Sequence, residues 1–464
     1  MDVRGALADA RPEVLWLEDP ARPRPLDPLS GSVTADLAVV GGGYTGLWTA
    51  LLAKERYPDL DVHLVEAGEC GWQASGRNGG FVAASLTHGF HNGQARWPEE
   101  LAALDRLGAA NLDAIGETIA EHGIDCCFER TGSLDVATRP HQVEALGEAA
   151  EEMRAAGHDV ELLDTDAVRA AVASPTYLAG LRDRHGTALV EPARLAWGLR
   201  RACLDLGVVI HEQTHVRDLH DDGRRIEVVC QGGVLRADRV ALGTNAFPPL
   251  LQRLRLMTVP VYDHVLATEP LSAAQLASIG WAGHEGLGDS ANLFHYYRLT
   301  RDNRIVWGGY DAIYHYGSRI ARSLEQNERT HTLLAEHFFE TFPQLEGLRF
   351  THRWGGVIDT CTRFSAFFGT AYAGRVAYAL GYTGLGVGAT RFGADVMLDL
   401  LQGEDTERTR LRMVLERPLP FPPEPARAVG INVTRWSLER ADRRDGRRNL
   451  WLRALDRVGL GFDS

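Results

Sequence analysis

The stretch Ala35-Asp-Leu-Ala-Val-Val-Gly-Gly-Gly-Tyr-Thr-Gly46 decides how the rest of the chain is interpreted. Its apolar run from Leu37 to Val40 is typical of a strand that is buried on both faces. Gly41, Gly43 and Gly46 follow at G-x-G-x-x-G spacing, and the next residues have the composition of a helix. Glycines let such a turn bend sharply and approach a pyrophosphate, toward which the helix points its free N–H groups.

A second strand supports the prediction of a dinucleotide site. Val62 to Glu66 is apolar and ends in an acid 20 residues beyond Gly46. In dinucleotide-binding folds, an acid at this position binds a ribose hydroxyl. The same residues also fit a tight turn between a strand and a helix that binds no ligand.

Composition limits the class of protein. The chain has 464 residues, 45% of them hydrophobic, and a formal net charge of -13. This length predicts two or three domains, and the acidic surplus argues against a nucleic-acid partner. No apolar run approaches the roughly 18 residues of a membrane helix. Six cysteines in so long a chain indicate a reducing cytoplasm rather than a disulfide framework. We assign no metal ligands.

Hydrophobic periodicity predicts an α/β plus antiparallel β architecture. Helices are expected at 97–122, 140–156, 191–206 and 323–341, and strands at 132–137, 207–211, 226–230, 259–264, 292–299, 304–308 and 376–380. A Rossmann-like nucleotide domain is then assembled from discontinuous segments, 33–122, 176–255 and 351–401. An inserted substrate domain takes 123–175 and 256–350. Residues 1–32 form an N-terminal arm, and 402–464 form a tail that packs on the nucleotide domain.

Further glycine-rich stretches complete a family resemblance. After Gly41–Gly46 and Glu66 come the loop Ser75–Gly80, the turn Ala241–Asn245 and the strand-to-helix turn Gly381–Gly388, in this order. The chain resembles the FAD-dependent D-amino-acid oxidase-like oxidoreductases. Within them it is most similar to the gamma-glutamylputrescine oxidoreductase branch. The likeness to this branch lies in Ser75–Gly80, Arg353–Asp359 and the closing Gly459–Asp463.

The resemblance implies that FAD is the cofactor. It places the pyrophosphate at the first glycine turn, the adenosine ribose at Glu66 and the adenine at the backbone of Val216. The late glycine turn would bring a helix N-terminus to the flavin N1/O2 edge, where reduced flavin is anionic. The residues implied to bind FAD are Gly41, Gly43, Tyr44, Thr45, Gly46, Glu66, Ser75, Gly76, Arg77, Asn78, Gly79, Gly80, Val216, Gly243, Thr244, Gly384, Leu385, Gly386 and Gly388.

The resemblance also implies amine oxidation. A hydride equivalent moves from the carbon beside nitrogen to flavin N5, and water hydrolyses the resulting imine, so no obligate base is expected. The expected substrate is a primary or secondary amine, either gamma-glutamylputrescine-like or amino-acid-like. One alternative is N-dealkylation of an amino acid, as in sarcosine oxidases, and another is a non-catalytic flavin-binding scaffold. The absence of a second nucleotide motif disfavours monooxygenases and disulfide reductases.

Four residues are candidates for the reacting centre, with Arg353 as an alternative to one of them. His264 ends an expected strand and either tunes the amine or the flavin or is structural. Tyr297 faces opposite to its two neighbours, one of which is Arg298, so one face of that strand lines the pocket. Arg298 or Arg353 forks onto a substrate carboxylate or pairs with a surface acid. Trp354, beside two glycines, forms an aromatic wall or packs in the core.

Charged residues bear on the substrate and the oxidant. The aspartates available to bind a cationic tail are Asp263, Asp289, Asp311 and Asp359, and the sequence does not rank them. Lys54, the only lysine, is expected on the exposed side of the first helix. Relatives of sarcosine oxidase use a lysine beside the flavin to react with oxygen. We therefore predict that reoxidation uses another cationic group, or that the electron acceptor is not oxygen.

Two further features are left open by the sequence. Some relatives attach FAD covalently to a cysteine, and Cys361 is the nearest candidate. It precedes Gly369 by only eight residues, so we expect non-covalent FAD. The arginine-rich stretch Arg435–Arg453 is a helix lying on a domain, a partner surface or a solvated segment.

Overall fold

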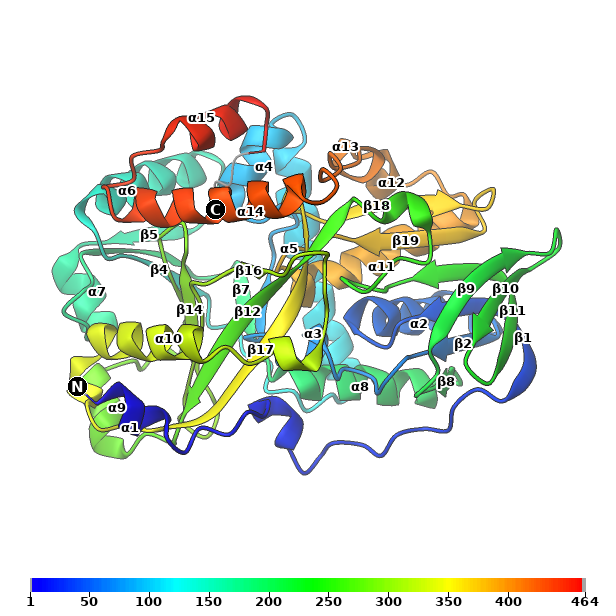
Figure 1. Ribbon diagram of the computed structural model, residues 1–464, viewed down its shortest axis with the longest axis horizontal. Coiled ribbons are helices and arrows are strands. Elements are labelled where there is room, and N and C mark those ends of the chain that lie inside the picture. The colour runs from blue at the N-terminus through cyan, green and yellow to red at the C-terminus, as the bar shows by residue number, and fades with distance from the viewer. Residues whose placement is uncertain (1, 461–464) are drawn as a thin grey trace.

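The computed structural model describes residues 2–460, in which two large β-sheets lie side by side (Figure 1). Residues 461–463 of the stretch Gly459–Asp463 lie outside the described part. Within residues 2–460, no helix combines the length and apolar character needed to span a bilayer.

The first sheet contains the strand predicted before the glycine turn. Its order is β18 (Phe367–Ala371), β19 (Val376–Leu380), β11 (Gly233–Leu242), β1 (Gly31–Val40), β2 (Val62–Val65) and β8 (Val209–His211). All neighbours are parallel except β18 and β19. A meander of β9 (Val216–Asp221) and β10 (Ile226–Cys230) pairs with β11. The carboxyl ends of β1, β2 and β11 therefore meet at one edge.

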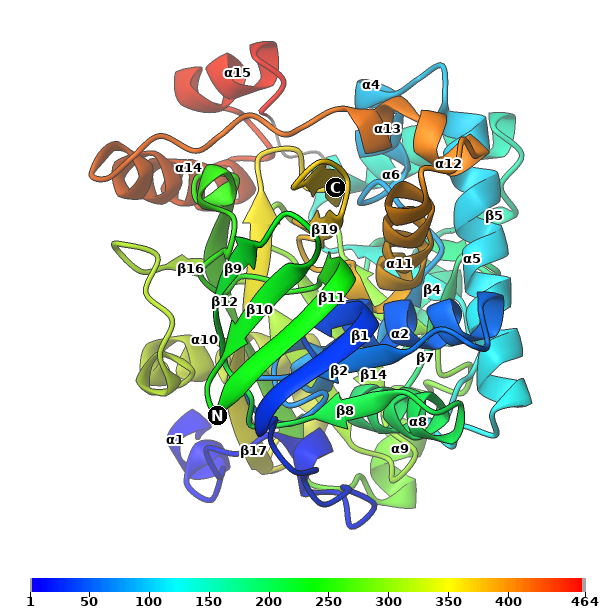
Figure 2. The same cartoon turned by 90° about the vertical axis from the view of Figure 1, so that its right-hand side faces the viewer.

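Helices cover one face of the first sheet. They are α2 (Tyr44–Arg56), α5 (Leu101–Glu121), α8 (Pro192–Asp205) and α11 (Gly386–Gln402), and Figure 2 shows them beside β1 and β2. Leu37 and Val39 of β1 pack with these helices, whereas Ala38 and Val40 pack on the other face with β9, β10 and β11. Burial on both faces confirms the interpretation of the apolar run.

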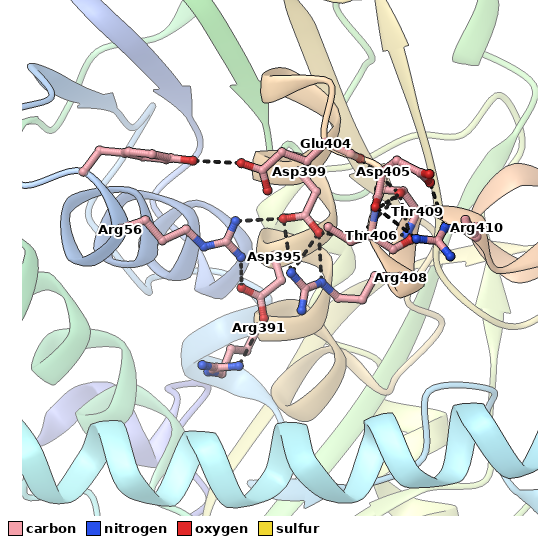
Figure 3. A network of polar contacts seen from close by, with 11 residues as sticks. Arg56, Arg391, Asp395, Asp399, Glu404, Asp405, Thr406, Arg408, Thr409 and Arg410 are labelled. Carbon is pink, nitrogen blue, oxygen red and sulfur yellow. Dashed lines mark hydrogen bonds and ion pairs between the residues drawn. The ribbon is translucent and has the colours of Figure 1, made fainter.

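Asp399, near the end of α11, fixes this helix to α2. The side chain is fully buried, and its oxygens pair with Arg56 Nη1 at 2.8 Å and Arg408 Nη2 at 2.8 Å (Figure 3). Arg56 also pairs with Asp395, one turn earlier on α11. A buried carboxylate is tolerated when it is paired in this way. The network holds together two helices whose opposite ends face the site described below.

The second sheet is mostly antiparallel. Its order is β16 (Ile313–Tyr314), β12 (Thr258–Thr268), β15 (Ile305–Gly309), β14 (His295–Leu299), β13 (Gly286–Asp289), β4 (Ser133–Ala137), β6 (Ala179–Asp183) and β5 (Val160–Leu163), with β17 (Phe350–Cys361) paired to β12. The segments predicted from the sequence put β6 and β17 in the nucleotide domain. The structure corrects this prediction, because both strands belong to the second sheet. Alternating residues identify a strand but not the sheet that it joins.

The two faces of the second sheet have different neighbours. The outer face is covered by α10 (Glu328–Thr341), α7 (Thr165–Ala171), α9 (Ala273–Ile279) and the short α1 (Val3–Leu7). On the inner face, α6 (Pro140–Ala155) packs on β4, β5 and β6 at one end of the sheet. The remaining inner face is open toward the first sheet. A small sheet of β3 (Phe81–Ala83) and β7 (Thr187–Leu189) lies nearby.

The C-terminal tail extends over both parts of the molecule. The helices α12 (Glu407–Arg410) and α13 (Arg412–Leu415) lie by α11 and β18, whereas α14 (Ala426–Asp442) and α15 (Leu450–Arg457) lie on the other side (Figures 1 and 2). Leu438 and Leu452 pack on Leu293, and Asp442 accepts hydrogen bonds from the segment before β14. The prediction that the whole tail packs on the nucleotide domain is therefore wrong, because α14 and α15 pack beside the second sheet.

Short elements complete the chain. They are α3 (Ala74–Arg77), α4 (Phe90–Arg96) and the 3-10 helices η1 (Leu15–Glu18), η2 (Gln252–Leu254), η3 (Arg322–Leu324) and η4 (Pro343–Leu345). The N-terminal arm crosses from one sheet to the other. Arg11 N donates to Thr351 O on β17, and Leu29 N donates to Thr214 Oγ1 near the first sheet.

Candidate active site

A cavity of about 2300 Å³ lies between the two sheets. It is lined by the carboxyl ends of β1, β2 and β11, by the open inner face of the second sheet, and by α14 and α15. Typical small-molecule pockets have about 300–1,000 Å³. The cavity therefore has room for a ligand much larger than a simple amine.

The first glycine turn brings the N-terminus of α2 to this cavity. Gly41 has φ +109°, and a Cβ there would lie 2.5 Å from Gly243 O, so the two neighbouring turns touch through their backbones. α2 has no side-chain cap, and Tyr44 N donates to Ser75 Oγ at 2.9 Å. The open helix start is the kind of site that binds phosphate groups.

Glu66 follows β2 and is held by three donors. Its Oε2 accepts from Gly42 N at 2.6 Å, and its Oε1 accepts from Gly68 N at 2.7 Å and Trp72 Nε1 at 2.9 Å. Burial raises the pKa of this carboxyl. The side chain lines the cavity beside the glycine turn, which fits the ribose position that the sequence indicated.

Three contacts fix the loop Ser75–Gly80 between the sheets. Arg77 Nη1 pairs with Glu325 Oε2 at 2.6 Å, and Arg77 O accepts from Trp354 Nε1 at 2.9 Å. Asn78 O accepts from Trp16 Nε1 of the N-terminal arm at 3.0 Å. These contacts join elements that are far apart in sequence, so the loop forms a rigid wall of the cavity.

The late glycine turn forms another wall. Gly384 has φ +95°, and a Cβ there would meet no atom within 4 Å. Leu385 and Gly386 also line the cavity, and α11 begins at Gly386 without a side-chain cap. The partial positive charge of a 17-residue helix is therefore directed at the cavity.

Most of the residues implied to bind FAD lie on this cavity. Those that line it are Gly41, Gly43, Tyr44, Thr45, Glu66, Ser75, Arg77, Asn78, Gly79, Val216, Gly243, Thr244, Gly384, Leu385 and Gly386. Gly46, Gly76, Gly80 and Gly388 do not line it. A Cβ at each would lie 1.8 to 2.3 Å from a carbonyl oxygen of Gly41, Gly71, Val190 or Ala83. These four glycines allow close backbone packing behind the walls.

The groups around the cavity fit a dinucleotide. Two uncapped helix starts provide N–H donors for anionic groups, and Glu66 provides acceptors for hydroxyls. The two starts and the loop Ser75–Gly80 border one continuous cavity. An elongated ligand with a phosphate centre and a ring system at its end matches this donor set.

Two of the candidate catalytic residues, His264 and Tyr297, lie between the second sheet and the helices on its outer face. The structure therefore corrects the prediction that they belong to the reacting centre. His264 is at the middle of β12, which continues to Thr268, and its ring lies 5.3 Å from that of His331 on α10. The Tyr297 ring lies 4.4 Å from that of Trp307, and its hydroxyl bonds that of Tyr177 at 2.6 Å. Both side chains face α10 because they occupy the outward positions of their strands.

Arg298 and Trp354 also lie away from the cavity, between the second sheet and the loop Ser75–Gly80. Arg298 Nη1 donates to Val190 O at 2.6 Å, its guanidinium lies 5.9 Å from the ring centre of Trp16, and burial lowers its pKa to about 10. Trp354 is 1% exposed and supports Arg77. Neither side chain lines the cavity. The predictions that Arg298 binds a substrate carboxylate and that Trp354 forms an aromatic wall are therefore corrected: both residues support neighbouring backbone segments. Arg353 does not line the cavity either.

Tyr296, rather than its neighbours, reaches the cavity. A Cβ at Gly79 would lie 2.7 Å from Tyr296 Cε2, so the ring packs directly on the loop Ser75–Gly80. Its hydroxyl donates to Asp263 Oδ2 at 2.6 Å, and burial raises the pKa of Asp263 to about 6. The alternation on β14 was predicted, but the inward face was not identified.

The four aspartates named from the sequence all line the cavity, each with a protein partner. Asp263 bonds Tyr296, and Asp289 Oδ2 lies 2.6 Å from His295 Nδ1. Asp311 pairs with Arg435, and Asp359 accepts from Gly381 N at 2.5 Å. Asp135 on β4 lines the same cavity and was missed by the sequence analysis.

The structure gives the positions of Lys54 and Cys361, which the sequence analysis discussed for the reaction with oxygen and for covalent flavin attachment. Lys54 Nζ donates to the carbonyls of Pro58 and Leu60 and does not line the cavity. Cys361 is completely buried, its thiol donates to Ser365 O at 3.1 Å, and burial raises its pKa. A protonated, inward-bonded thiol is a poor nucleophile.

Comparisons with known proteins agree with this geometry. The chain is 33% identical to gamma-glutamylputrescine oxidoreductase of Escherichia coli (strain K12), covering 83% of this chain and 87% of that protein. It is 25% identical to sarcosine oxidase subunit beta of Arthrobacter sp, covering 76% and 81%. The crystal structure of glycine oxidase from Geobacillus kaustophilus has the same fold, with a TM-score of 0.69, 20% identity, and coverage of 83% and 100%. Residues 36–400 match the family described as FAD dependent oxidoreductase, and the chain belongs to this family.

Proposed function

We propose that this FAD-dependent oxidoreductase oxidises a primary or secondary amine, gamma-glutamylputrescine-like or amino-acid-like, to an imine that water hydrolyses. The observation that supports this proposal most is the 33% identity to gamma-glutamylputrescine oxidoreductase over most of both chains. The cavity supports it as well, because carboxylates on its walls favour a cationic substrate.

FAD would lie along the walls described above, without a covalent bond to Cys361. The start of α2 and the glycine turns would bind its pyrophosphate, Glu66 its ribose, the backbone of Val216 its adenine, and the start of α11 the flavin N1/O2 edge. When bound, FAD supplies the acceptor for a hydride equivalent. The inward-bonded thiol of Cys361 supports non-covalent binding.

The substrate would react where the loop Ser75–Gly80 meets the second sheet. Tyr296 packs on Gly79 of that loop and bonds Asp263, and all three residues line the cavity, so this junction of the loop and the sheet is accessible to a substrate. The amine must be neutral to react. Asp263, with a pKa of about 6, would take the proton of the substrate ammonium at Oδ2 near neutral pH.

Anaerobic flavin reduction tests this function. The purified holoprotein is mixed without oxygen with gamma-glutamylputrescine, putrescine, glycine or sarcosine, and the flavin absorbance is recorded. We expect bleaching by at least one amine. A flavin that dithionite reduces but no amine bleaches would contradict the proposal and favour the non-catalytic scaffold.

N-dealkylation remains a second candidate because of the similarity to sarcosine oxidase subunit beta. The two reactions differ in their products. Oxidation of an N-methyl group releases formaldehyde, whereas oxidation of a terminal aminomethyl group releases ammonia and a longer aldehyde. Assaying the products of each bleaching amine distinguishes the two candidates.

Compartment and oxidant are also part of the proposal. All six cysteines are free thiols, which supports a reducing cytoplasm. Since the sole lysine is distant from the cavity, reoxidation would use another cationic group or an acceptor other than oxygen. Oxygen uptake compared with reduction of an artificial dye separates these possibilities.

A further inference from the structure

Asp135 differs from the other aspartates that line the cavity. It lies at the centre of β4 on the inner face of the second sheet, and its Oδ1 would lie 3.0 Å from a Cβ placed on Gly288. Among the described residues, no hydrogen bond or ion pair to its carboxylate is found. The carboxylates of Asp263, Asp289, Asp311 and Asp359 are each bonded within the protein, as described above.

The surroundings of Asp135 make an ionised carboxylate costly. Its side chain is accessible from the cavity, yet burial within the molecule, together with Asp183 and Asp289, raises its pKa to about 7. Asp183 Oδ1 accepts from His185 N at 3.0 Å and Gly186 N at 2.9 Å, so this neighbour is already satisfied. Asp183 and Asp289 are bonded within the protein, whereas Asp135 is not. A cation that enters the cavity would therefore stabilise the ionised form of Asp135.

The sheet provides an open path from the proposed reacting centre to Asp135. Tyr296 lies opposite Gly288 in the register of β14 and β13, and Gly288 lies opposite Asp135 in that of β13 and β4. Two strand spacings of about 4.8 Å separate the backbones of Tyr296 and Asp135 by roughly 10 Å. Gly288, between them, has no side chain, so a slender chain can lie across the sheet at this point.

We propose that Asp135 binds a second, distal cationic group of the amine substrate, and this inference rests on the proposed amine oxidation. The substrates of the protein are then amines that carry two separated cationic groups, rather than monoamines or simple amino acids. One ammonium loses its proton and is oxidised near Tyr296, while the other stays charged and donates to the Asp135 carboxylate. Asp183 and Asp289 add negative potential without contacting the ligand.

Matched pairs of amines and variants test this inference. The probes are putrescine and 1,8-diaminooctane, compared with n-butylamine and n-octylamine, in anaerobic stopped-flow measurements of flavin reduction. The holoenzyme is compared with Asp135→Asn, which keeps the shape of the side chain but removes its charge. The control is Glu144→Gln, which removes an exposed carboxylate of α6 that does not line the cavity.

The expected result is a preference for at least one diamine over its matched monoamine. A charge-assisted hydrogen bond predicts a preference of about 10- to 100-fold in the apparent dissociation constant. Asp135→Asn should bring the ratio close to one with little change for the monoamine, and Glu144→Gln should leave the ratio unchanged. Unaltered flavin absorbance and melting temperature show that the Asn variant is folded.

Two outcomes would overturn the inference. One is equal use of diamines and monoamines by the native enzyme, and the other is a diamine preference that survives in Asp135→Asn. In both cases amines still bleach the flavin, so the proposed function is retained. If no amine bleaches the flavin of the native protein, the proposed function itself fails, and the inference that depends on it fails with it.

Discussion

Replacing Glu66 by Gln tests whether the acid after β2 is part of the cofactor site. The carboxylate accepts three hydrogen bonds, from Gly42 N, Gly68 N and Trp72 Nε1, at 2.6 to 2.9 Å. A glutamine has a single acceptor oxygen. If this oxygen accepts from Gly68 and Trp72, the NH₂ group of the glutamine points toward Gly42 N. Two hydrogen-bond donors would then face each other without an acceptor between them.

The magnitude follows from two opposing effects. Losing a hydrogen bond to a charged acceptor costs about 1.5–3 kcal/mol. Burial raises the pKa of Glu66, so the native carboxylate carries a desolvation penalty that glutamine does not. We therefore expect the free energy of unfolding of the apoprotein to fall by only about 1 kcal/mol. The variant also keeps only one of the two acceptor oxygens of a residue that lines the cavity, so FAD should bind roughly tenfold or more weakly.

Two assays separate these effects. Urea unfolding of the apoprotein measures stability, and quenching of flavin fluorescence during titration measures FAD affinity. Glu69→Gln is the matched control, because Glu69 is partly exposed and pairs with Arg22 on the surface. It should change either quantity by about 0.5 kcal/mol or less. An unchanged FAD affinity in folded Glu66→Gln would refute the assignment.

Further predictions concern the reacting centre, the flavin linkage and the glycine packing. Tyr296→Phe removes a donor that lowers the pKa of Asp263, so this pKa should rise above about 6, and the acid limb of the pH profile of flavin reduction should move to higher pH. An unmoved limb would show that Asp263 is not the group that titrates. Cys361→Ser should retain active flavin that acid precipitation releases as completely as from the native protein; flavin that stays with the native precipitate would mean a covalent link. Gly388→Ala places a Cβ 2.3 Å from Ala83 O, and this overpacking should cost about 1–3 kcal/mol in thermal unfolding. An unchanged melting temperature would contradict the close packing of α11.

The nucleotide-binding half of the fold was predictable because its signals are local. The apolar run before Gly41, the acid after β2 and the bounds of β19 all follow from residues within a few positions of one another. The assignments of β6 and β17 failed for a different reason. Their alternating patterns specify strands, but the partner strands lie far away in the sequence, and no local pattern identifies the sheet.

The substrate side of the site was less predictable because it depends on which face of a strand is turned inward. His264 and Tyr297 were selected for their chemistry, and both face the outer core. The alternation of side chains along a strand puts Tyr296 and Tyr297 on opposite faces of the sheet, but it does not indicate which face borders the cavity. One signal was available. Gly288 and Gly308, on the strands that flank β14, occupy inward positions beside Tyr296, where a side chain would meet its ring or the Asp135 carboxylate.

The two halves of the cavity should therefore respond differently to substitution. The side proposed to bind FAD is built mainly from backbone groups at glycine turns and helix starts, which only a change in chain geometry removes. The side proposed to bind the substrate is built from side chains such as Asp135 and Asp263 on strands that the rest of the sheet keeps in place. We therefore expect a single exchange at Asp135 to alter which amine is bound while the flavin stays in its site.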